Sequence, residues 1–203
     1  MRKVVGPSGL WRAGWLCSTV LLSLAQAPSQ KPVLVVLETE KGVIEIEVDV
    51  ARAPATSVNF LKYVDGGFYN GGEFHRTVRP DAQARTDYPI QVIQARRVRG
   101  PDVPPGFPPI ALERTSVTGL KHLAGTVSMA RSGPDSATNE FFICVAEAPE
   151  LDFAGKRNAD GQGFAAFGRV VRGMEVVKAI HASPVGRGES LAPTIGILKG
   201  HRK

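Results

Sequence analysis

The stretch VLVVLETEKGVIEIEV, residues 33–48, predicts a β-hairpin. Ile44, Ile46 and Val48 alternate with acidic residues at a period of two, which is the spacing of a strand with one buried and one solvated face. The Glu-Lys-Gly sequence at 40–42 supplies the turn between the two strands. The hairpin therefore favours a fold built mainly from short antiparallel strands.

The rest of the chain continues this pattern, with short apolar segments separated by turns rich in glycine and proline. Further candidate strands are 73–78, 90–98, 125–130, 140–145, 165–171 and 194–199. Two segments have helical spacing instead: 53–67, where Val58, Leu61 and Val64 recur every three residues, and 173–183. Strands outnumber helices and no βαβ alternation occurs, so the sequence predicts an antiparallel barrel or sandwich with two helices packed on it.

The length and composition of the chain indicate one well-filled domain. It has 203 residues, of which 43% are hydrophobic and 22% charged, and these ordinary globular values exclude a disordered or fibrous protein. Two connections are unusually long, 79–89 and 152–163, and the proline-dense segment 99–113 is expected to be irregular. Loops of this length are often functional or simply inserted.

The N-terminal segment 1–27 has the composition of a signal peptide and its cleavage region. A basic stretch precedes an apolar run of about half the roughly 20 residues that a membrane span needs, and small residues at Ala25 and Ala27 offer two cleavage positions. The folded domain is then 28–203, periplasmic or secreted, with no membrane attachment after cleavage. Loss of Arg2, Lys3 and Arg12 lowers the formal net charge from +6 to +3, too mild a charge to indicate nucleic-acid binding.

The candidate nucleophiles and metal ligands lack partners in the sequence. His75, in the stretch EFHRTVRP at 73–80, alternates with Arg76 along a strand, so it is expected to point to the opposite side and to be structural. The sequence contains no GxSxG elbow, so His122 and His181 likewise have no candidate serine to activate. Cys144 lies in an apolar strand and is expected to be a buried, inert thiol. No metal site, cofactor motif or disulfide is therefore expected.

Several separated motifs, taken together, resemble the cyclophilin-type peptidyl-prolyl cis–trans isomerases of the exported bacterial kind. They occur in the family's order from about residue 33 onward: GFYNGGEFHRTV at 67–78, QVIQ at 91–94, GTVSMAR at 125–131, NEFFICVAEAPELD at 139–152 and FGRVVRGMEVVKAI at 167–180. The resemblance implies a mainly β fold, a closed antiparallel eight-stranded barrel capped by two α-helices. It also implies a cofactor-independent, monomeric isomerase of Xaa-Pro bonds that acts on proline-containing polypeptides and assists the folding of exported proteins.

The resemblance assigns roles to residues position by position. Arg76 matches the catalytic arginine, Gln94 the glutamine that holds the substrate backbone, and Phe142 the aromatic floor of the proline pocket. Strand parity agrees in part, because Phe141 and Ile143 are then left for the core. The further substrate-binding residues implied by the resemblance are Val92, Met129, Ala130, Leu151, Arg131, Glu140, Gln91 and Phe164.

Five positions depart from the family pattern. Glu140 and Arg131 stand where the family has Gln and Asn, and they form either a compensating pair across the groove or two independent surface charges. Gln91 stands where a pocket phenylalanine is expected, unless the long preceding loop shifts the alignment so that Ile90 fills that place. Glu150 replaces a tryptophan, and Phe164 lies near the place of a histidine. These changes leave a second possibility open, a low-activity binding module or chaperone for proline-containing segments.

Overall fold

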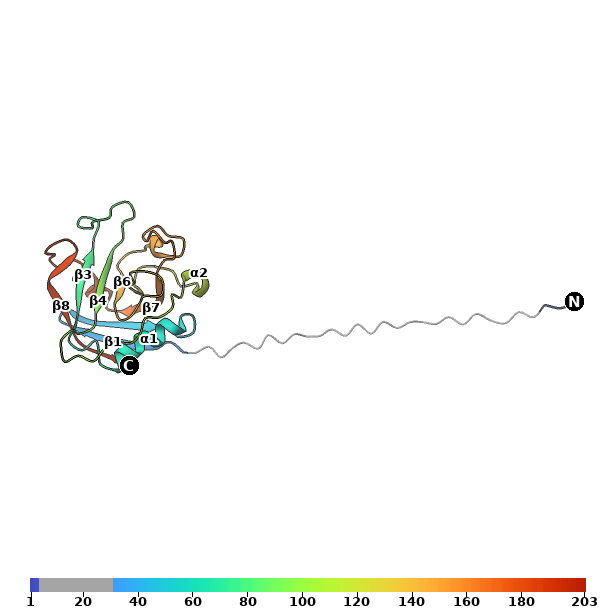
Figure 1. Ribbon diagram of the computed structural model, residues 1–203, viewed down its shortest axis with the longest axis horizontal. Coiled ribbons are helices and arrows are strands. Elements are labelled where there is room, and N and C mark those ends of the chain that lie inside the picture. The colour runs from blue at the N-terminus through green and yellow to red at the C-terminus, as the bar shows by residue number, and fades with distance from the viewer. Residues whose placement is uncertain (4–30) are drawn as a thin grey trace.

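Eight antiparallel strands close into a barrel in the computed structural model, which describes residues 1–3 and 31–203 (Figure 1). Around the barrel their order is β1-β2-β7-β5-β6-β4-β3-β8, and β8 pairs back with β1. The strands are β1 Val33–Thr39, β2 Gly42–Val48, β3 Gly72–Val78, β4 Val92–Arg96, β5 Thr126–Met129, β6 Phe141–Cys144, β7 Ala165–Arg172 and β8 Ser190–Arg202. The predicted closed eight-stranded barrel is confirmed.

The predicted signal peptide at 1–27 lies almost entirely outside the described residues, so it stays a prediction. Among the residues that the structure describes, no helix is both long and apolar enough to span a membrane. The proline-dense segment 99–113 contains no helix and no strand longer than a single bridge, from Ile110 to Ala137.

Two helices pack on the barrel, as expected: α1 (Pro54–Asp65) and α3 (Met174–His181). The short helix α2 (Thr115–Thr118) and the 3-10 turn η1 (Pro149–Leu151) were not predicted. Pro54 occupies the first turn of α1, where its missing N–H costs nothing, and the N–H of Gly66 closes the last turn onto the carbonyl of Lys62.

Of the three residues predicted to form the buried face of α1, one lies outside it. Phe60, Leu61 and Val64 are buried, but Val58 is 49% exposed. A repeat of three residues drifts around a helix by about 60° at each step, because an α-helix has 3.6 residues per turn. Val58 therefore lies beyond the edge of the apolar face that the other three share.

Apolar side chains form two layers, one inside the barrel and one on its outer surface. The inner layer includes Phe60, Phe141 and Ile143, and the ring of Phe60 lies 5.4 Å from that of Phe141. The outer layer consists of Val78, Ile90, Val92, Phe142, Cys144, Ala148 and Leu151. Because successive residues of β6 point to opposite faces, this one strand contributes to both layers. The predicted inward direction of Phe141 and Ile143 is confirmed.

We expect the substitution Phe60→Ala to lower the free energy of unfolding by about 3–5 kcal/mol, because it opens a cavity where Phe60 meets Tyr69, Phe141 and Phe167. Val58→Ala on the same helix is the matched control and should change it by less than about 0.5 kcal/mol. Urea unfolding followed by circular dichroism measures both. Equal losses for the two variants would contradict this account of the helix face.

Candidate active site

Arg76, Gln94 and Phe142 lie in one row across three neighbouring strands. Arg76 of β3 is the register partner of Gln94 of β4, and Gln94 is the partner of Phe142 of β6. Side chains directly opposite each other in adjacent strands are close neighbours on the same face of a sheet. The barrel therefore brings together three residues on its outer surface, although the first and the last are 66 positions apart in sequence.

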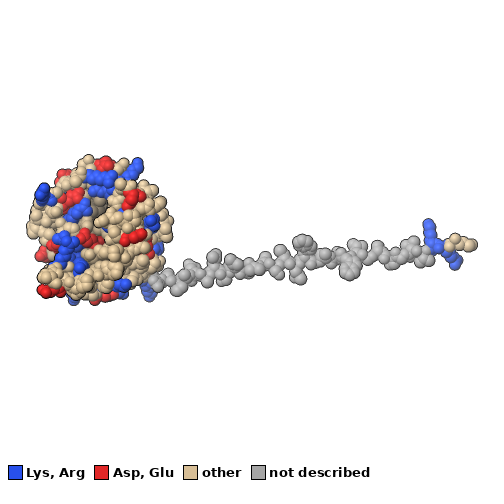
Figure 2. All heavy atoms as spheres, viewed as in Figure 1, with Lys and Arg blue, Asp and Glu red and all other residues tan. Residues whose placement is uncertain are grey.

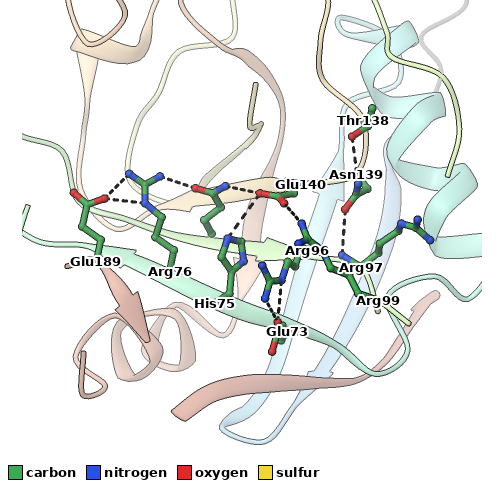
Figure 3. A network of polar contacts seen from close by, with 11 residues as sticks. Glu73, His75, Arg76, Arg96, Arg97, Arg99, Thr138, Asn139, Glu140 and Glu189 are labelled. Carbon is green, nitrogen blue, oxygen red and sulfur yellow. Dashed lines mark hydrogen bonds and ion pairs between the residues drawn. The ribbon is translucent and has the colours of Figure 1, made fainter. Parts of the chain in front are cut away.

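The guanidinium of Arg76 is held on two sides (Figure 3). Its Nη1 donates to Oε1 of Gln94 at 2.7 Å, and its Nε donates to Oε2 of Glu189 at 2.8 Å, while Nη2 donates to the same oxygen. The amide of Gln94 donates in turn to Oε2 of Glu140 at 2.8 Å, which fixes its oxygen toward Arg76. Three of the five N–H donors of Arg76 are engaged in this way, and two remain for a ligand.

A β-bulge at His75 corrects the predicted direction of that residue. The register between β3 and β4 shifts between Phe74 and Arg76, so the extra residue breaks the alternation of faces. His75 Nε2 consequently lies 3.8 Å from Glu140, on the same polar surface as Arg76 and not opposite it (Figure 3). Burial lowers the pKa of His75, although Glu140 opposes the shift, which favours a neutral imidazole at pH 7.

An apolar cavity of about 200 Å³ lies beside this row. Phe142, Val92 and Leu151 belong to the outer apolar layer and line it, together with Ala130 and Phe164, and the Arg76 guanidinium stands at its edge. The residues that line it are Arg76, Ile90, Val92, Gln94, Ala130, Arg131, Phe142, Leu151, Arg157, Asn158 and Phe164. A cavity that combines apolar walls with several polar groups is typical of a ligand site.

Three of the predicted substrate-binding residues do not line this cavity: Met129, Gln91 and Glu140. Met129 is buried inside the barrel, because its neighbour Ala130 faces outward and successive strand residues alternate. Gln91 does not line the cavity either, whereas Ile90 does. Ile90 therefore takes the place expected of a pocket aromatic residue, which was the second of the two alignments considered.

Of the two alternatives for Glu140 and Arg131, a compensating pair or two independent charges, the structure shows independent charges, since each has a different partner. Glu140 accepts from Gln94 and from Arg99, the latter at 3.0 Å. Arg131 forms a two-point pair with Asp160, at 2.7 and 2.9 Å, and its side chain is only 1% exposed. The hydrogen bonds from Arg131 lower the pKa of Asp160 to about 2, so this pair stays charged at neutral pH.

The Phe142 ring is fixed from two directions. The ring of Phe164 meets it edge-on at 5.4 Å, and the imidazole of His122 lies nearly parallel to it at 5.9 Å. His122 is itself fixed by Asp152 at Nδ1, 2.8 Å away, and by the hydroxyl of Ser128 at Nε2, 3.0 Å away. Because an ionised Asp152 only accepts hydrogen bonds, it places the imidazole proton on Nδ1 and leaves Nε2 to accept from Ser128.

This Ser128–His122–Asp152 arrangement was not foreseen, and it resembles the hydrogen-bond chain of a serine hydrolase. It cannot act as one, because Ser128 is fully buried and His122 is 1% exposed, so no substrate carbonyl reaches the hydroxyl. The thiol of Cys144 is also buried, as predicted, and burial raises its pKa to about 12. Within residues 31–203 no nucleophile therefore reaches the cavity, and no cluster of side chains there could hold a metal ion.

Sequence reasoning missed three residues that shape the site: Glu189, Arg157 and Asn158. Glu189 precedes β8 and becomes a neighbour of Arg76 only because β8 pairs with β3. Arg157 and Asn158 lie in the long connection 152–163, where no family pattern guides alignment. Ile90, in contrast, was one of the two alternatives that the sequence left open, and it has the same strand parity as Val92 and Gln94.

A second cavity of about 320 Å³ adjoins the first on the side of Glu140. The two share Gln94, Ala130 and Arg131, and the second is lined almost wholly by polar residues. It is lined by Gln94, Arg99, Ala130, Arg131, Ser132, Ser136, Thr138, Asn139 and Glu140. An apolar and a polar compartment side by side suit an extended peptide with one buried ring.

Solved structures with the same architecture include a cyclophilin-type peptidyl-prolyl cis-trans isomerase of Cryptosporidium parvum. It superposes with a TM-score of 0.66 over 85% of this chain and 98% of that one, at 19% identity. At that identity the match shows the fold: a closed barrel of the cyclophilin type.

Sequence comparison identifies the family. Residues 34–201 match the family described as cyclophilin type peptidyl-prolyl cis-trans isomerase/CLD. Peptidyl-prolyl cis-trans isomerase A of Dickeya dadantii (strain 3937) is 40% identical over 147 residues, which are 72% of this chain and 70% of that protein. Isomerase B of Escherichia coli (strain K12) is 35% identical over 159 residues, 76% and 87% of the two chains. The chain therefore belongs to the cyclophilin-type peptidyl-prolyl isomerases, which need no cofactor.

We expect Glu189 to position Arg76, so that Glu189→Ala lowers kcat about tenfold and leaves KM nearly unchanged, because a small displacement of a reacting group is costly. Glu189→Gln keeps an acceptor oxygen and should retain most of the activity. The exposed Glu175→Ala is the control for loss of an acidic residue. A change in KM alone, measured with a proline peptide under protease-free conditions, would contradict this role.

Proposed function

We propose that Arg76, Gln94 and Phe142 carry out the isomerisation of Xaa-Pro bonds by this enzyme. Rotation about the amide must cross roughly 18–20 kcal/mol, because resonance keeps the bond planar. No covalent bond breaks, so the protein has only to bind the twisted amide more tightly than the planar one. The observation that carries the proposal is the fixed guanidinium of Arg76 at the edge of an apolar cavity that contains Phe142.

Each side chain has a distinct part in this proposal. The proline ring fills the apolar cavity against Phe142, whose own movement is restricted by Phe164 and His122. A free N–H of Arg76 donates to the prolyl nitrogen as its lone pair becomes localised during rotation. Gln94 holds the substrate backbone, and its amide is already oriented by Glu140. No proton is transferred, which agrees with a neutral His75 in this place.

The two charged residues that depart from the family pattern, Glu140 and Arg131, leave the site intact in this geometry. Glu140 acts as an acceptor for Gln94, and the buried Arg131 is neutralised by Asp160. Neither charge points into the apolar cavity as an unpaired group. This supports an active isomerase over the alternative of a binding module with little turnover.

We expect Arg76→Ala to reduce kcat/KM by about 10²–10³-fold, the usual loss when one stabilising donor is removed from a transition state. His75→Ala is the neighbouring control and should stay within about twofold of the wild type, since no proton transfer is required. A protease-free isomerisation assay on a Xaa-Pro peptide measures both, with circular dichroism to verify folding. Equal and near-background rates for wild type and Arg76→Ala would instead support a binding module.

We further propose that the enzyme is exported, acts as a monomer and assists the folding of other exported proteins. The support is the composition of residues 1–27, a basic stretch followed by an apolar run and small residues. Expression of the full chain in a bacterial host, followed by fractionation, tests export. Intact mass of the periplasmic or secreted form should then show cleavage after Ala25 or Ala27. Recovery only of the uncleaved chain, inside the cell, would contradict the proposal.

A further inference from the structure

The two long connections, 79–89 and 152–163, are joined to each other at the rim of the cavity. Nη1 of Arg157 donates to the carbonyl of Tyr88 at 2.8 Å, to that of Arg85 at 3.2 Å and to Oε1 of Gln83 at 3.2 Å. Arg85 donates back to the carbonyl of Arg157. Arg157 is therefore fixed at the point where the two connections meet, and it lines the apolar cavity.

Three arginines line this cavity, and their charges are balanced differently. Arg76 is paired with Glu189, and Arg131 with Asp160. Among residues 31–203, Arg157 forms no ion pair, and its guanidinium donates to two carbonyl oxygens and one side-chain amide oxygen. Lys and Arg side chains are interspersed with acidic ones in Figure 2 at the upper end of the barrel, where Figure 1 places these connections. Arg157 is thus the one arginine of the cavity wall that has no direct ion pair with a carboxylate of residues 31–203.

The remaining donors of Arg157 are unused by the protein. Only Nη1 makes hydrogen bonds within the described part of the chain, so Nε and Nη2 have none there. Burial lowers the pKa of Arg157; Glu189 opposes this shift, whereas Arg76 and Arg85 add to it. A guanidinium that is partly desolvated and hydrogen-bonded through only one of its nitrogens is suited to bind an anion through the other two.

We infer that Arg157 forms a subsite for an acidic side chain of the substrate, so that this isomerase prefers proline-containing segments with Glu or Asp directly beside the proline. The inference rests on the proposed function, because it places the substrate proline in the apolar cavity that Arg157 lines. A carboxylate there receives the two-point hydrogen bonds for which a guanidinium has the right geometry. The cavity itself offers no other unpaired cation from the described residues.

The test compares wild-type kcat/KM for four peptides that differ only beside the proline. Glu and Gln are placed in turn directly before or directly after it, and both peptide ends are blocked so that no terminal carboxylate competes. At low ionic strength the Glu peptide should exceed its Gln counterpart by about fivefold at one of the two positions, and about 0.5 M salt should reduce this ratio toward one.

Variants then assign the preference to Arg157. Arg157→Gln should lower the Glu/Gln ratio to about one, and Arg157→Lys, which keeps the charge without the two-point geometry, should give an intermediate value. Arg52→Gln removes an exposed arginine, paired with Asp49, that lies away from this cavity, and it should leave the ratio unchanged. If Arg157→Gln does not fold, the lysine variant and the salt dependence of the wild type decide.

Failure of the acidic preference can be distinguished from failure of the proposed function. Normal turnover by the wild type with a Glu/Gln ratio of one at both positions would overturn the acidic preference and leave the proposed function intact. A ratio that persists in folded Arg157→Gln would also overturn it, because another cation would then be responsible. Absence of isomerisation with all four peptides would overturn the proposed function, and the preference with it.

Discussion

The register of three strands is the constraint on which the site depends. Arg76, Gln94 and Phe142 face one another because β3, β4 and β6 are adjacent and aligned, and closure of the barrel leaves each strand two neighbours that hold this alignment. A shift of one residue would turn the whole set toward the interior, since side chains alternate between faces. The same alternation separates Phe141, in the inner core, from Phe142, in the outer apolar layer.

The polar groups of the site act mainly by holding one another. Glu189 and Gln94 hold Arg76, Glu140 orients Gln94, and Ser128 and Asp152 hold the imidazole that packs on Phe142. Each of these contacts joins residues from different strands or connections. Since a catalyst for bond rotation has to favour one geometry over another, fixed side chains serve the reaction better than reactive ones.

Most of the fold could be predicted from the sequence, because a period of two identifies strands and the eight segments found in that way are the eight strands of the barrel. The same parity distinguishes Phe142 from its neighbours, and applied fully it would have excluded Met129. The bulge at His75 could not be predicted, since it depends on pairing with β4. The partners of Arg131, Arg76 and Arg157 could not be predicted either. They lie in loops and in the segment before β8, which are remote in sequence from these arginines.

The ion pair between the buried Arg131 side chain and Asp160 has a consequence for binding entropy. Arg131 fastens the connection 152–163 to the barrel through Asp160 and through the carbonyl of Gly163, so the segment carrying Arg157 is ordered before any ligand arrives. A mobile segment would lose roughly 1–2 kcal/mol of conformational freedom per residue on becoming fixed, and that loss would oppose association. Here that loss of conformational freedom is part of the free energy of folding. A peptide therefore binds to a cavity wall that is already ordered.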